Sequence, residues 1–268
     1  MDGNDIALAC NGGPEEDLKI DGSSYVEVRN NHVHDGANPS PLGGEGLNIS
    51  GGELTADGSH DIRVYNNVVN NLIKLGFGVE AWKNHLYNVE VFNNVSYNNA
   101  WGFIVASEQG GTDENIKIYN NIAYSNVNAG FSINWWGGTK DGPKKNIQFI
   151  NNTSYGNGRG IWIYSPSNEN VLVENNIFSQ NSVNMEIISG AVAQTIIDHN
   201  LFYGPGGTGG TNPVVGNPLF VNPMGADFHL QSGSPAIDAG SSLNAPNKDY
   251  SGNLRPRGAG YDIGAYEY

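Results

Sequence analysis

The chain has 268 residues, of which 38% are hydrophobic and 37 are glycine. Its 13 basic residues against 27 acidic ones give a formal net charge of −14. This excess of acid argues against binding to nucleic acid, whose phosphates require patches of lysine and arginine. Cys10 is the single cysteine, so no internal disulfide can form. No apolar run approaches the length of a membrane span.

The dominant feature along the chain is a recurring doublet of asparagines. Its copies are Asn30-Asn31, Asn66-Asn67, Asn93-Asn94, Asn120-Asn121, Asn151-Asn152 and Asn175-Asn176, with His199-Asn200 as a degenerate seventh. The second residues of successive copies are 36, 27, 27, 31, 24 and 24 positions apart. Internal repetition with a period of about 20–50 residues is typical of a solenoid, in which each repeat forms one coil.

A short alternating run precedes each doublet and predicts a β-strand. In chain order these runs lie at 25–29, 61–65, 88–92, 115–119, 146–150 and 170–174. Each strand supplies inward aliphatic side chains, and the asparagine turns the chain while its amide bonds to backbone or to the asparagine of the next coil. Stacked coils of this kind form an asparagine ladder inside a parallel β-helix.

Each repeat also contains a second run, usually opened by glycine, that predicts another strand. These runs are 45–50, 77–82, 101–106, 129–134 and 159–164, with further copies at 5–9 and 185–189. We expect one inward column of Leu47, Val79, Phe103, Phe131 and Ile161, and a second of Ile49, Ala81, Val105, Ile133 and Ile163. Such columns are what neighbouring coils need in order to bury each other.

The two ends of the chain depart from this repeat. The first residues already resemble part of a coil, so we expect the chain to begin within a longer solenoid, whose upstream part would carry a cap and an export signal. After Tyr203 the repeat stops at a stretch rich in glycine and proline. We therefore predict a β-helix over 1–204 and an extended tail over 205–268 that folds back and covers the last coil.

Long loops flank the glycine-led strands, which marks their face as the functional one. All five tryptophans lie on or beside these strands, and indole rings stack well on the apolar faces of sugars. The alternative for Trp101 and Trp135 is packing beneath loops. We predict a carbohydrate groove lined by Trp82, Lys83, Asn134, Trp135, Trp136, Trp162, Tyr164 and His34.

Four carboxylates are candidates for acid–base chemistry in this groove: Glu80, Glu45, Asp35 and Glu108. Glycoside hydrolysis needs one acid to protonate the leaving oxygen and a second carboxylate to attack or to activate water. Glu80 is expected to point outward at the centre of the face, in one row with Asn48 and Ile104. Glu45 lies one coil away with an offset of about three residues, and convergence of the two side chains would give a separation suited to inversion. An ordinary exposed glutamate is the alternative in each case.

A lyase would instead need a base beside a uronate carboxylate and a cation to neutralise that carboxylate. Lys83 is the strand lysine expected in the groove, and Asp35, Glu45 and Glu80 offer oxygen ligands for Ca²⁺. We predict no metal site and no required cofactor, so that calcium would serve only the lyase alternative. The histidines at 32, 34, 60 and 85 lack the spacing of a zinc motif.

The body of the chain resembles the right-handed parallel β-helix superfamily of pectate-lyase-like proteins. The tail segments NPLFVN, SPAIDAG, DYSGNLRP and YDIGAYEY resemble the terminal module, called choice-of-anchor Q, of bacterial secreted β-helix proteins. GEGLNIS, GFGVEAW and WGFIVAS resemble coils of the family-nine polysaccharide lyases, which use a lysine base and a calcium held by aspartates. Glu45 and Glu80 stand at two acidic positions of that family, whereas Ile104 stands in place of its lysine and Gly76 and Phe77 in place of an aspartate pair.

These observations predict an all-β protein, a right-handed parallel β-helix of about seven coils with an asparagine ladder. The resemblance implies a protein that is secreted or held at the cell surface. We expect a monomeric glycoside hydrolase that acts on a polysaccharide or oligosaccharide, with no nucleic-acid partner. The alternatives are a calcium-dependent polysaccharide lyase and a non-catalytic glycan-binding or surface module.

Overall fold

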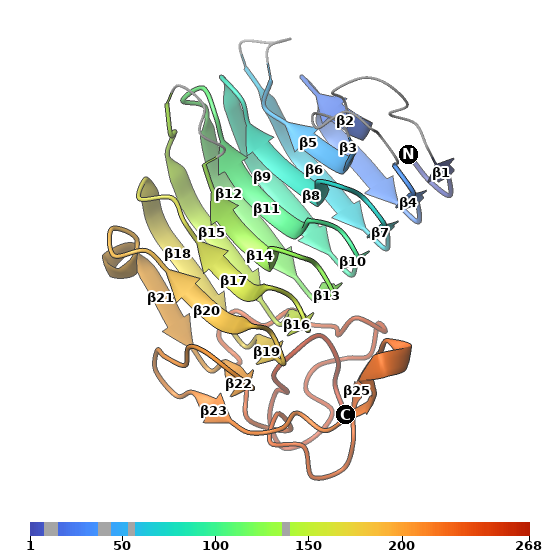
Figure 1. Cartoon of the computed structure of the whole chain (residues 1–268), viewed down its shortest axis with the longest axis vertical. Coiled ribbons are helices and arrows are strands. Elements are labelled where there is room, and N and C mark those ends of the chain that lie inside the picture. Colours follow the sequence, from blue (N-terminus) through green and yellow to red (C-terminus); the bar gives the residue numbers. More distant parts are fainter. Residues whose placement is uncertain (8–15, 37–43, 53–56, 136–139) are drawn as a thin grey trace.

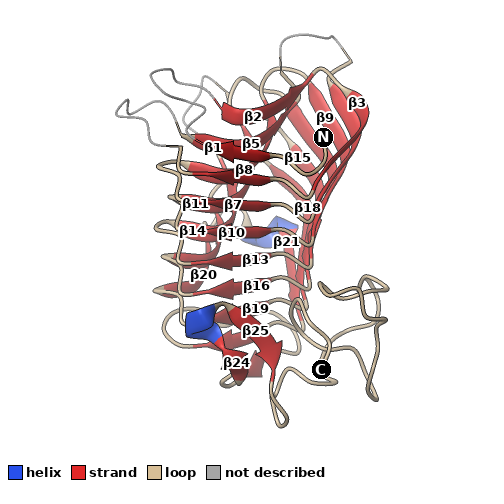
Figure 2. Ribbon diagram, turned by 90° about the vertical axis from the view of Figure 1, so that its right-hand side faces the viewer, coloured by secondary structure: helices blue, strands red, loops and turns tan. Residues whose placement is uncertain are grey.

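A computed structural model describes residues 1–7, 16–36, 44–52, 57–135 and 140–268. It confirms the predicted all-β solenoid: parallel strands wind through about six complete turns, one fewer than expected (Figure 1). Seen from the side in Figure 2, the strands of successive coils stack like rungs. None of the helices in the described part of the chain has the length and apolar character needed to cross a bilayer.

Three parallel sheets run along the solenoid, and each coil contributes one strand to each of them. The doublet sheet contains β3 (Ser24–Arg29), β6 (Ser59–Tyr65), β9 (His85–Phe92), β12 (Thr112–Tyr119), β15 (Lys144–Ile150), β18 (Asn168–Glu174) and β21 (Thr195–Asp198). The glycine-led sheet contains β2 (Glu16–Asp21), β5 (Glu45–Ser50), β8 (Leu75–Ala81), β11 (Trp101–Ser107), β14 (Ala129–Asn134), β17 (Arg159–Ile163) and β20 (Val183–Ile187).

The third sheet, the short-strand sheet, was not predicted from the sequence. It contains β1 (Asp5–Ala7), β4 (His32–His34), β7 (Val68–Asn70), β10 (Val95–Tyr97), β13 (Ile122–Tyr124), β16 (Thr153–Tyr155), β19 (Ile177–Ser179), β22 (Leu201–Tyr203) and β23 (Val214–Val215). Most of its strands have only three residues, too few to display an alternating pattern. The remaining elements are β24 (Phe220–Asn222), β25 (Asp227–Leu230) and the short 3₁₀ helices η1 (Val192–Gln194) and η2 (Pro223–Gly225).

The two asparagines of each doublet perform different tasks. The first adopts a left-handed backbone, with φ between 52° and 57° in all six Asn-Asn copies, and so turns the chain. The second joins a buried ladder that runs from Asn31 to Asn200. Within it, Asn121 Nδ2 donates to Asn152 Oδ1 at 3.1 Å and to the Val91 carbonyl at 2.8 Å, and Asn121 Oδ1 accepts from Asn94 N at 2.9 Å. The predicted ladder is confirmed.

A second buried ladder, which the sequence analysis missed, lies at the turn after the short strands. It contains Asn99, Asn126, Asn157 and Asn181, and the Oδ1 of each accepts from the backbone N–H of the residue stacked on it. One coil has a doublet at this turn, Asn98-Asn99, but the residue before the ladder asparagine is Ser125, Gly156 and Gln180 in the next coils, so no repeated doublet reveals it.

Replacing Asn121 by alanine should destabilise the fold by on the order of 3 kcal/mol, because buried groups on both neighbouring coils lose their partners. The backbone N–H of Asn94 would keep no acceptor in a site that excludes water. Urea unfolding would measure the loss, with exposed Asn217→Ala as the control. Equal midpoints for the two variants would mean that the ladder contributes nothing to stability.

The apolar interior is as expected, but the pairing of one strand differs by two residues. Phe77 pairs with Leu47 and Phe103, so it takes the place expected for Val79 in the first column. Val79 pairs with Ile49 and Val105, so it takes the place expected for Ala81 in the second. The sequence GFG contains two glycines, and Gly76, rather than Gly78, is the equivalent of Gly102. A Cβ atom added to Gly76 would lie 2.3 Å from Ser96 Oγ, so close packing against the short-strand turn requires glycine here.

The tail (Figure 1, orange to red) packs on the outer face of the short-strand sheet. It covers more than the last coil, since its contacts extend back along the sheet to β13. Phe220, Phe228 and Ile263 bury themselves against side chains of β13, β19 and β22. The outward amides of the doublets hold it in place. Asn120 Nδ2 donates to the Lys248 carbonyl at 2.7 Å, and Asn175 Nδ2 donates to the Ser241 carbonyl at 2.8 Å.

Candidate functional site

A hollow of about 390 Å³ lies on the outer face of the glycine-led sheet, where its strands begin. Most of its lining comes from β5, β8 and β11 and from the turns that lead into β8, β11 and β14. The lining residues are Glu45, Ile73, Lys74, Leu75, Ala100, Trp101, Glu108 and Asn128. Of the predicted catalytic carboxylates, Glu45 and Glu108 are among the lining residues, although Glu108 follows the far end of β11. Trp101, for which packing beneath a loop was the alternative, also lines the hollow.

The residue before each leading glycine forms a row across this face. Glu45, Leu75, Trp101, Ala129 and Arg159 occupy that position in successive coils. Trp101 pairs directly with Leu75 and Ala129. Leu75 packs outside the main core with Ile104, Ala106 and Trp101, so this row faces outward in the middle of the sheet. Stacking in register thus brings a carboxylate, an indole and a guanidinium onto one surface.

Two of the predicted catalytic carboxylates converge on one amide. Asn48 Nδ2 donates to Glu80 Oε2 at 2.7 Å and lies 3.5 Å from Glu45 Oε2. In the corrected register Glu80 pairs with Ser50 and Ala106, one row beyond the Asn48 row in which it was expected. Asn48 pairs with Gly78, and its side-chain amide reaches along the strand to Glu80.

The separation of the two carboxylates is shorter than the sequence suggested. The two oxygens lie 2.7 and 3.5 Å from the same Asn48 nitrogen, so they can be no more than 6.2 Å apart. Retaining glycosidases keep their carboxyl groups at about 5–5.5 Å, and inverting ones at about 6.5–9.5 Å. This upper limit lies below the inverting range, so the pair favours retention, whereas the sequence analysis expected spacing for inversion.

Lys74 supplies a cation that the sequence analysis did not identify. Its Nζ lies 3.0 Å from Glu45 Oε1, and both side chains are largely shielded from solvent. Lys74 precedes β8 in a turn, outside the strand positions from which groove residues were selected. Asn48 contacts both acids and Trp101 lines the hollow, and the place of Trp101 beside a leading glycine is the sequence signal that could have found it.

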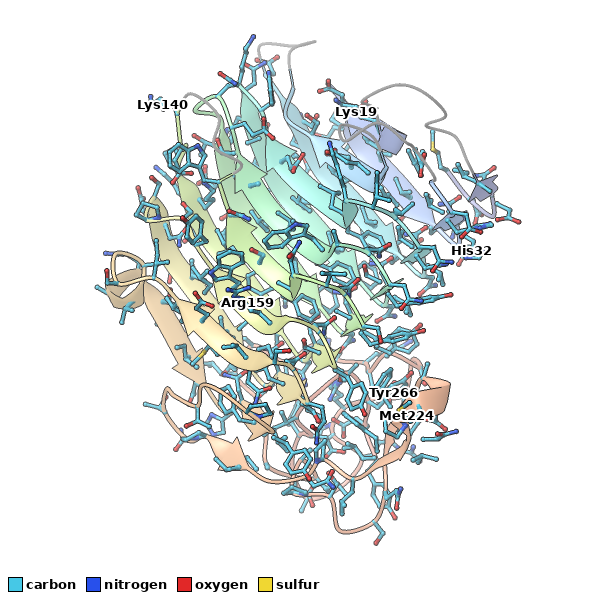
Figure 3. All side chains as sticks on the ribbon, viewed as in Figure 1. Lys19, His32, Lys140, Arg159, Met224 and Tyr266 are labelled. Atoms are coloured by element: carbon cyan, nitrogen blue, oxygen red, sulfur yellow. The ribbon has the colours of Figure 1, made fainter. Side chains whose placement is uncertain are left out.

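Stacked rings form one wall of the hollow. Trp101 and Trp162 lie parallel, with ring centroids 5.4 Å apart and planes 7° from parallel, although a whole coil separates their strands. Small residues on β14, Ala129 and Ser132, leave the space between them. The guanidinium of Arg159, labelled in Figure 3, lies 4.0 Å from the centroid of the Trp162 ring, and Arg159 also pairs with Glu186. Trp162 is thus in contact with both Trp101 and Arg159.

A buried group of charges lies behind Glu80, at the corner between the glycine-led and doublet sheets. Asp113 is fully buried, and its Oδ1 accepts from the backbone N–H of Ala81 at 3.0 Å. Burial raises the pKa of Asp113 well above its usual range, Lys144 opposes this rise, and the negative charge of Glu80 adds to it. Lys144, itself buried, pairs with Asp141. A second acidic group, Asp113, thus lies close to Glu80.

The remaining predicted residues divide between two regions. One region is the far end of the glycine-led sheet, where Trp82, Lys83, Asn134 and Trp135 lie at or just beyond the ends of β8 and β14. Tyr164 is exposed, and its ring contacts Trp162 with a centroid distance of 5.0 Å. Trp136 lies outside the described residues. Asp35 and His34 lie elsewhere, at the end of the short-strand sheet, where Asp35 accepts from Asn71 Nδ2 at 2.8 Å and contacts His34. The described residues therefore do not gather Asp35 with Glu45 and Glu80 as a calcium site would require.

A larger hollow, of about 580 Å³, lies on the doublet sheet. It follows a column of alternating charge, in which Arg63 pairs with Glu27 and Glu90. The neighbouring rings of Tyr65, Phe92 and Tyr119 stack on one another at centroid distances of 4.9 Å, so their faces are already covered. We regard this surface as scaffold, because its charges neutralise each other and its rings offer mainly edges.

The sequence matches no protein-family model and no curated protein. Among solved structures, the pectate lyase Pel9A has a TM-score of 0.62 to this chain and 16% sequence identity, over 98% of this chain and 69% of that one. XylC in its complex with xylose has a TM-score of 0.51 and 13% identity, over 90% of this chain and 46% of that one. These likenesses concern the fold, and they confirm a pectate-lyase-like β-helix.

Proposed function

We propose that this protein is a carbohydrate-active enzyme that hydrolyses glycosidic bonds with Glu45 and Glu80. One observation carries the proposal: both carboxylates lie near the single amide nitrogen of Asn48, beside a hollow walled by Trp101. The similarity of the fold to a pectate lyase and to a xylose-bound protein supports a sugar substrate. We further propose that the enzyme works outside the cell or at its surface, where it would have access to polysaccharide substrates.

The two carboxylates would take different roles. Glu45 would be the nucleophile, since Lys74 balances its charge and the spacing to Glu80 is shorter than inverting enzymes keep for an intervening water. Glu80 would protonate the leaving oxygen. After departure of the leaving group, Glu80 would activate the water that releases the sugar from Glu45.

The second candidate function is elimination by a lyase, and Lys74 is the observation that favours it. A lysine in the hollow could remove a proton beside a uronate carboxylate. The pairing of Lys74 with Glu45 makes this role harder, because the base would have to leave its carboxylate first.

A panel of neutral and uronate-containing polysaccharides, incubated with and without a chelator, distinguishes these functions. Hydrolysis predicts new reducing ends, no absorbance of unsaturated uronate, and no loss of activity on chelation. Unsaturated products would show the lyase instead. Glycan binding with no product after prolonged incubation would show a non-catalytic module.

A further inference from the structure

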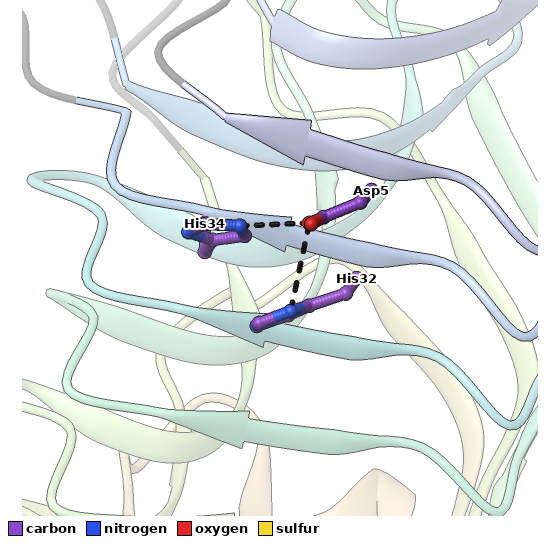
Figure 4. A group of neighbouring side chains, drawn as sticks. All are labelled: Asp5, His32 and His34. Carbon is purple, nitrogen blue, oxygen red and sulfur yellow. Dashed lines mark hydrogen bonds and ion pairs between the residues drawn. The ribbon is translucent and has the colours of Figure 1, made fainter.

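We propose that Asp5, His32 and His34 form a binding site for one divalent transition-metal ion. The site lies on the short-strand sheet and is independent of the carbohydrate site. Asp5 of β1 is the pairing partner of His32 of β4, and His34, two residues further on, faces the same side of the strand. One ligand atom from each residue lies within 4.8 Å of the other two (Figure 4).

The second nitrogen of each imidazole is already held by an oxygen. His32 Nε2 lies 2.8 Å from Asn70 Oδ1, and His34 Nδ1 lies 2.8 Å from Asp35 Oδ2. Neither an amide oxygen nor a carboxylate can donate, so the ring hydrogen belongs on these two nitrogens. The opposite nitrogens, His32 Nδ1 and His34 Nε2, face Asp5. Asp5 cannot donate either, so in the metal-free protein His34 Nε2 carries a hydrogen toward it at 2.8 Å, and a bound ion would replace that hydrogen. Metal-bound histidines are oriented in this way by their outer partners.

The distances suit a small ion after a slight adjustment. His34 Nε2 lies 2.8 Å from Asp5 Oδ1, and His32 Nδ1 lies 3.7 Å from the same oxygen. A tetrahedral Zn²⁺ with bonds of about 2.0–2.2 Å places its ligand atoms roughly 3.3–3.5 Å apart, between these two values. The Asp5 side chain is 76% exposed and can move by this amount. The two imidazole rings stack with centroids 4.2 Å apart, so they offer their nitrogens side by side.

The ligand set defines the class of ion. Two imidazole nitrogens and one carboxylate oxygen favour zinc and its neighbours in the transition series over calcium or magnesium, which prefer oxygen ligands alone. Three protein ligands on an exposed surface leave the remaining coordination positions to water. An ion here would also tie β1 to β4 and thereby stabilise the first strand.

One other group of this kind occurs in the described part of the chain, formed by Glu174, Asp198 and His199. Its oxygens are already engaged by the tail. Asp198 Oδ1 accepts from Thr211 Oγ1 at 2.7 Å and from Asn212 Nδ2 at 3.0 Å, and Glu174 Oε2 accepts from Asn244 Nδ2 at 2.8 Å. This group serves to fasten the tail, so the Asp5 group is the one with ligand atoms available.

Calorimetric titration of the purified, metal-free protein with ZnCl₂ tests the site. We expect one equivalent to bind, His34→Ala and His32→Ala each to weaken binding more than tenfold, and Asp35→Asn to weaken it about tenfold through loss of an outer partner. The control is His229→Ala. His229 is exposed and also pairs with an aspartate, Asp227 at 2.7 Å, but the ring beside it is that of Tyr266 and not a histidine. This control should bind zinc as the unaltered protein does.

Two further measurements separate a lost ligand from a damaged fold. The thermal midpoints of the metal-free variants should match that of the unaltered protein, because these side chains lie at the surface. Hydrogen exchange at Asp5–Ala7 should slow when zinc is added to the unaltered protein and should not slow in the His32→Ala/His34→Ala double variant. Absence of zinc binding, or zinc binding that survives in the double variant, would overturn the proposal.

Discussion

Replacing Glu45 by glutamine is expected to reduce kcat at least about 100-fold on any substrate found in the panel, because glutamine cannot form the glycosyl-enzyme intermediate. The change keeps the size of the side chain and its contact with Lys74, so stability should be little altered. Replacing Glu80 by glutamine should also lower kcat by about 10²–10⁴-fold, since no proton would reach the leaving oxygen. Initial rates at saturating substrate measure both effects.

Glu169→Gln is the matched control for these variants. Glu169 is an exposed glutamate on the doublet sheet that lies 3.6 Å from Lys145, so it shares the lysine pairing of Glu45 but not its place. Full activity is expected of Glu169→Gln.

Substrates with an activated leaving group need less help from an acid, so they should restore much of the activity of Glu80→Gln and little of that of Glu45→Gln. If both variants kept full activity, these carboxylates would have no catalytic role.

Replacing Arg255 by alanine should destabilise the protein by about 3–5 kcal/mol, because it leaves Glu267 charged, buried and without its partner. Arg255 Nη1 lies 2.6 Å from Glu267 Oε1, and both side chains are fully shielded from solvent. The same guanidinium donates to the Gly264 carbonyl at 2.8 Å and to Asn120 Oδ1 at 3.2 Å, and so fastens the tail to a coil. Urea unfolding would measure the loss.

Two comparisons isolate the effect of the buried pair. Arg257→Ala removes an exposed arginine from the same segment and should change stability little, since only its backbone N–H contacts Glu267. The double variant Arg255→Met/Glu267→Leu removes both charges and should be more stable than Arg255→Ala. A double variant as unstable as the single one would show that packing and the lost backbone contacts, rather than the unpaired charge, cause the destabilisation.

The repeat made most of the fold predictable from the sequence. In each doublet the first residue turns the chain and the second bonds within the buried ladder. Both roles call for a particular residue type, so the doublet is visible in the sequence of successive coils. The short strands and the second ladder left no such mark, because three residues show no alternation and a single asparagine has many other uses. The tail resisted prediction for a related reason: its contacts with Asn120 and Asn175 join positions more than 60 residues apart.

The candidate site was harder to predict, because it depends on the register between coils. Two glycines in GFG allowed two alignments, and the chosen one displaced Glu80 by two residues along the sheet. Asn48 and Lys74 gain importance only once Glu45 and Glu80 are correctly placed around them. His32 and His34 could not be grouped with Asp5 as metal ligands from the sequence for a similar reason, since Asp5 lies a whole coil away.

The anomeric configuration of the first released sugar, followed by proton NMR during hydrolysis, tests this account most directly. Two carboxylate oxygens that both lie within 3.5 Å of Asn48 Nδ2, closer together than an inverting pair, predict that the product initially keeps the configuration of the substrate bond. An inverted product, an unsaturated product, or no cleavage of any glycan would contradict the assignment of Glu45 and Glu80 as a catalytic pair.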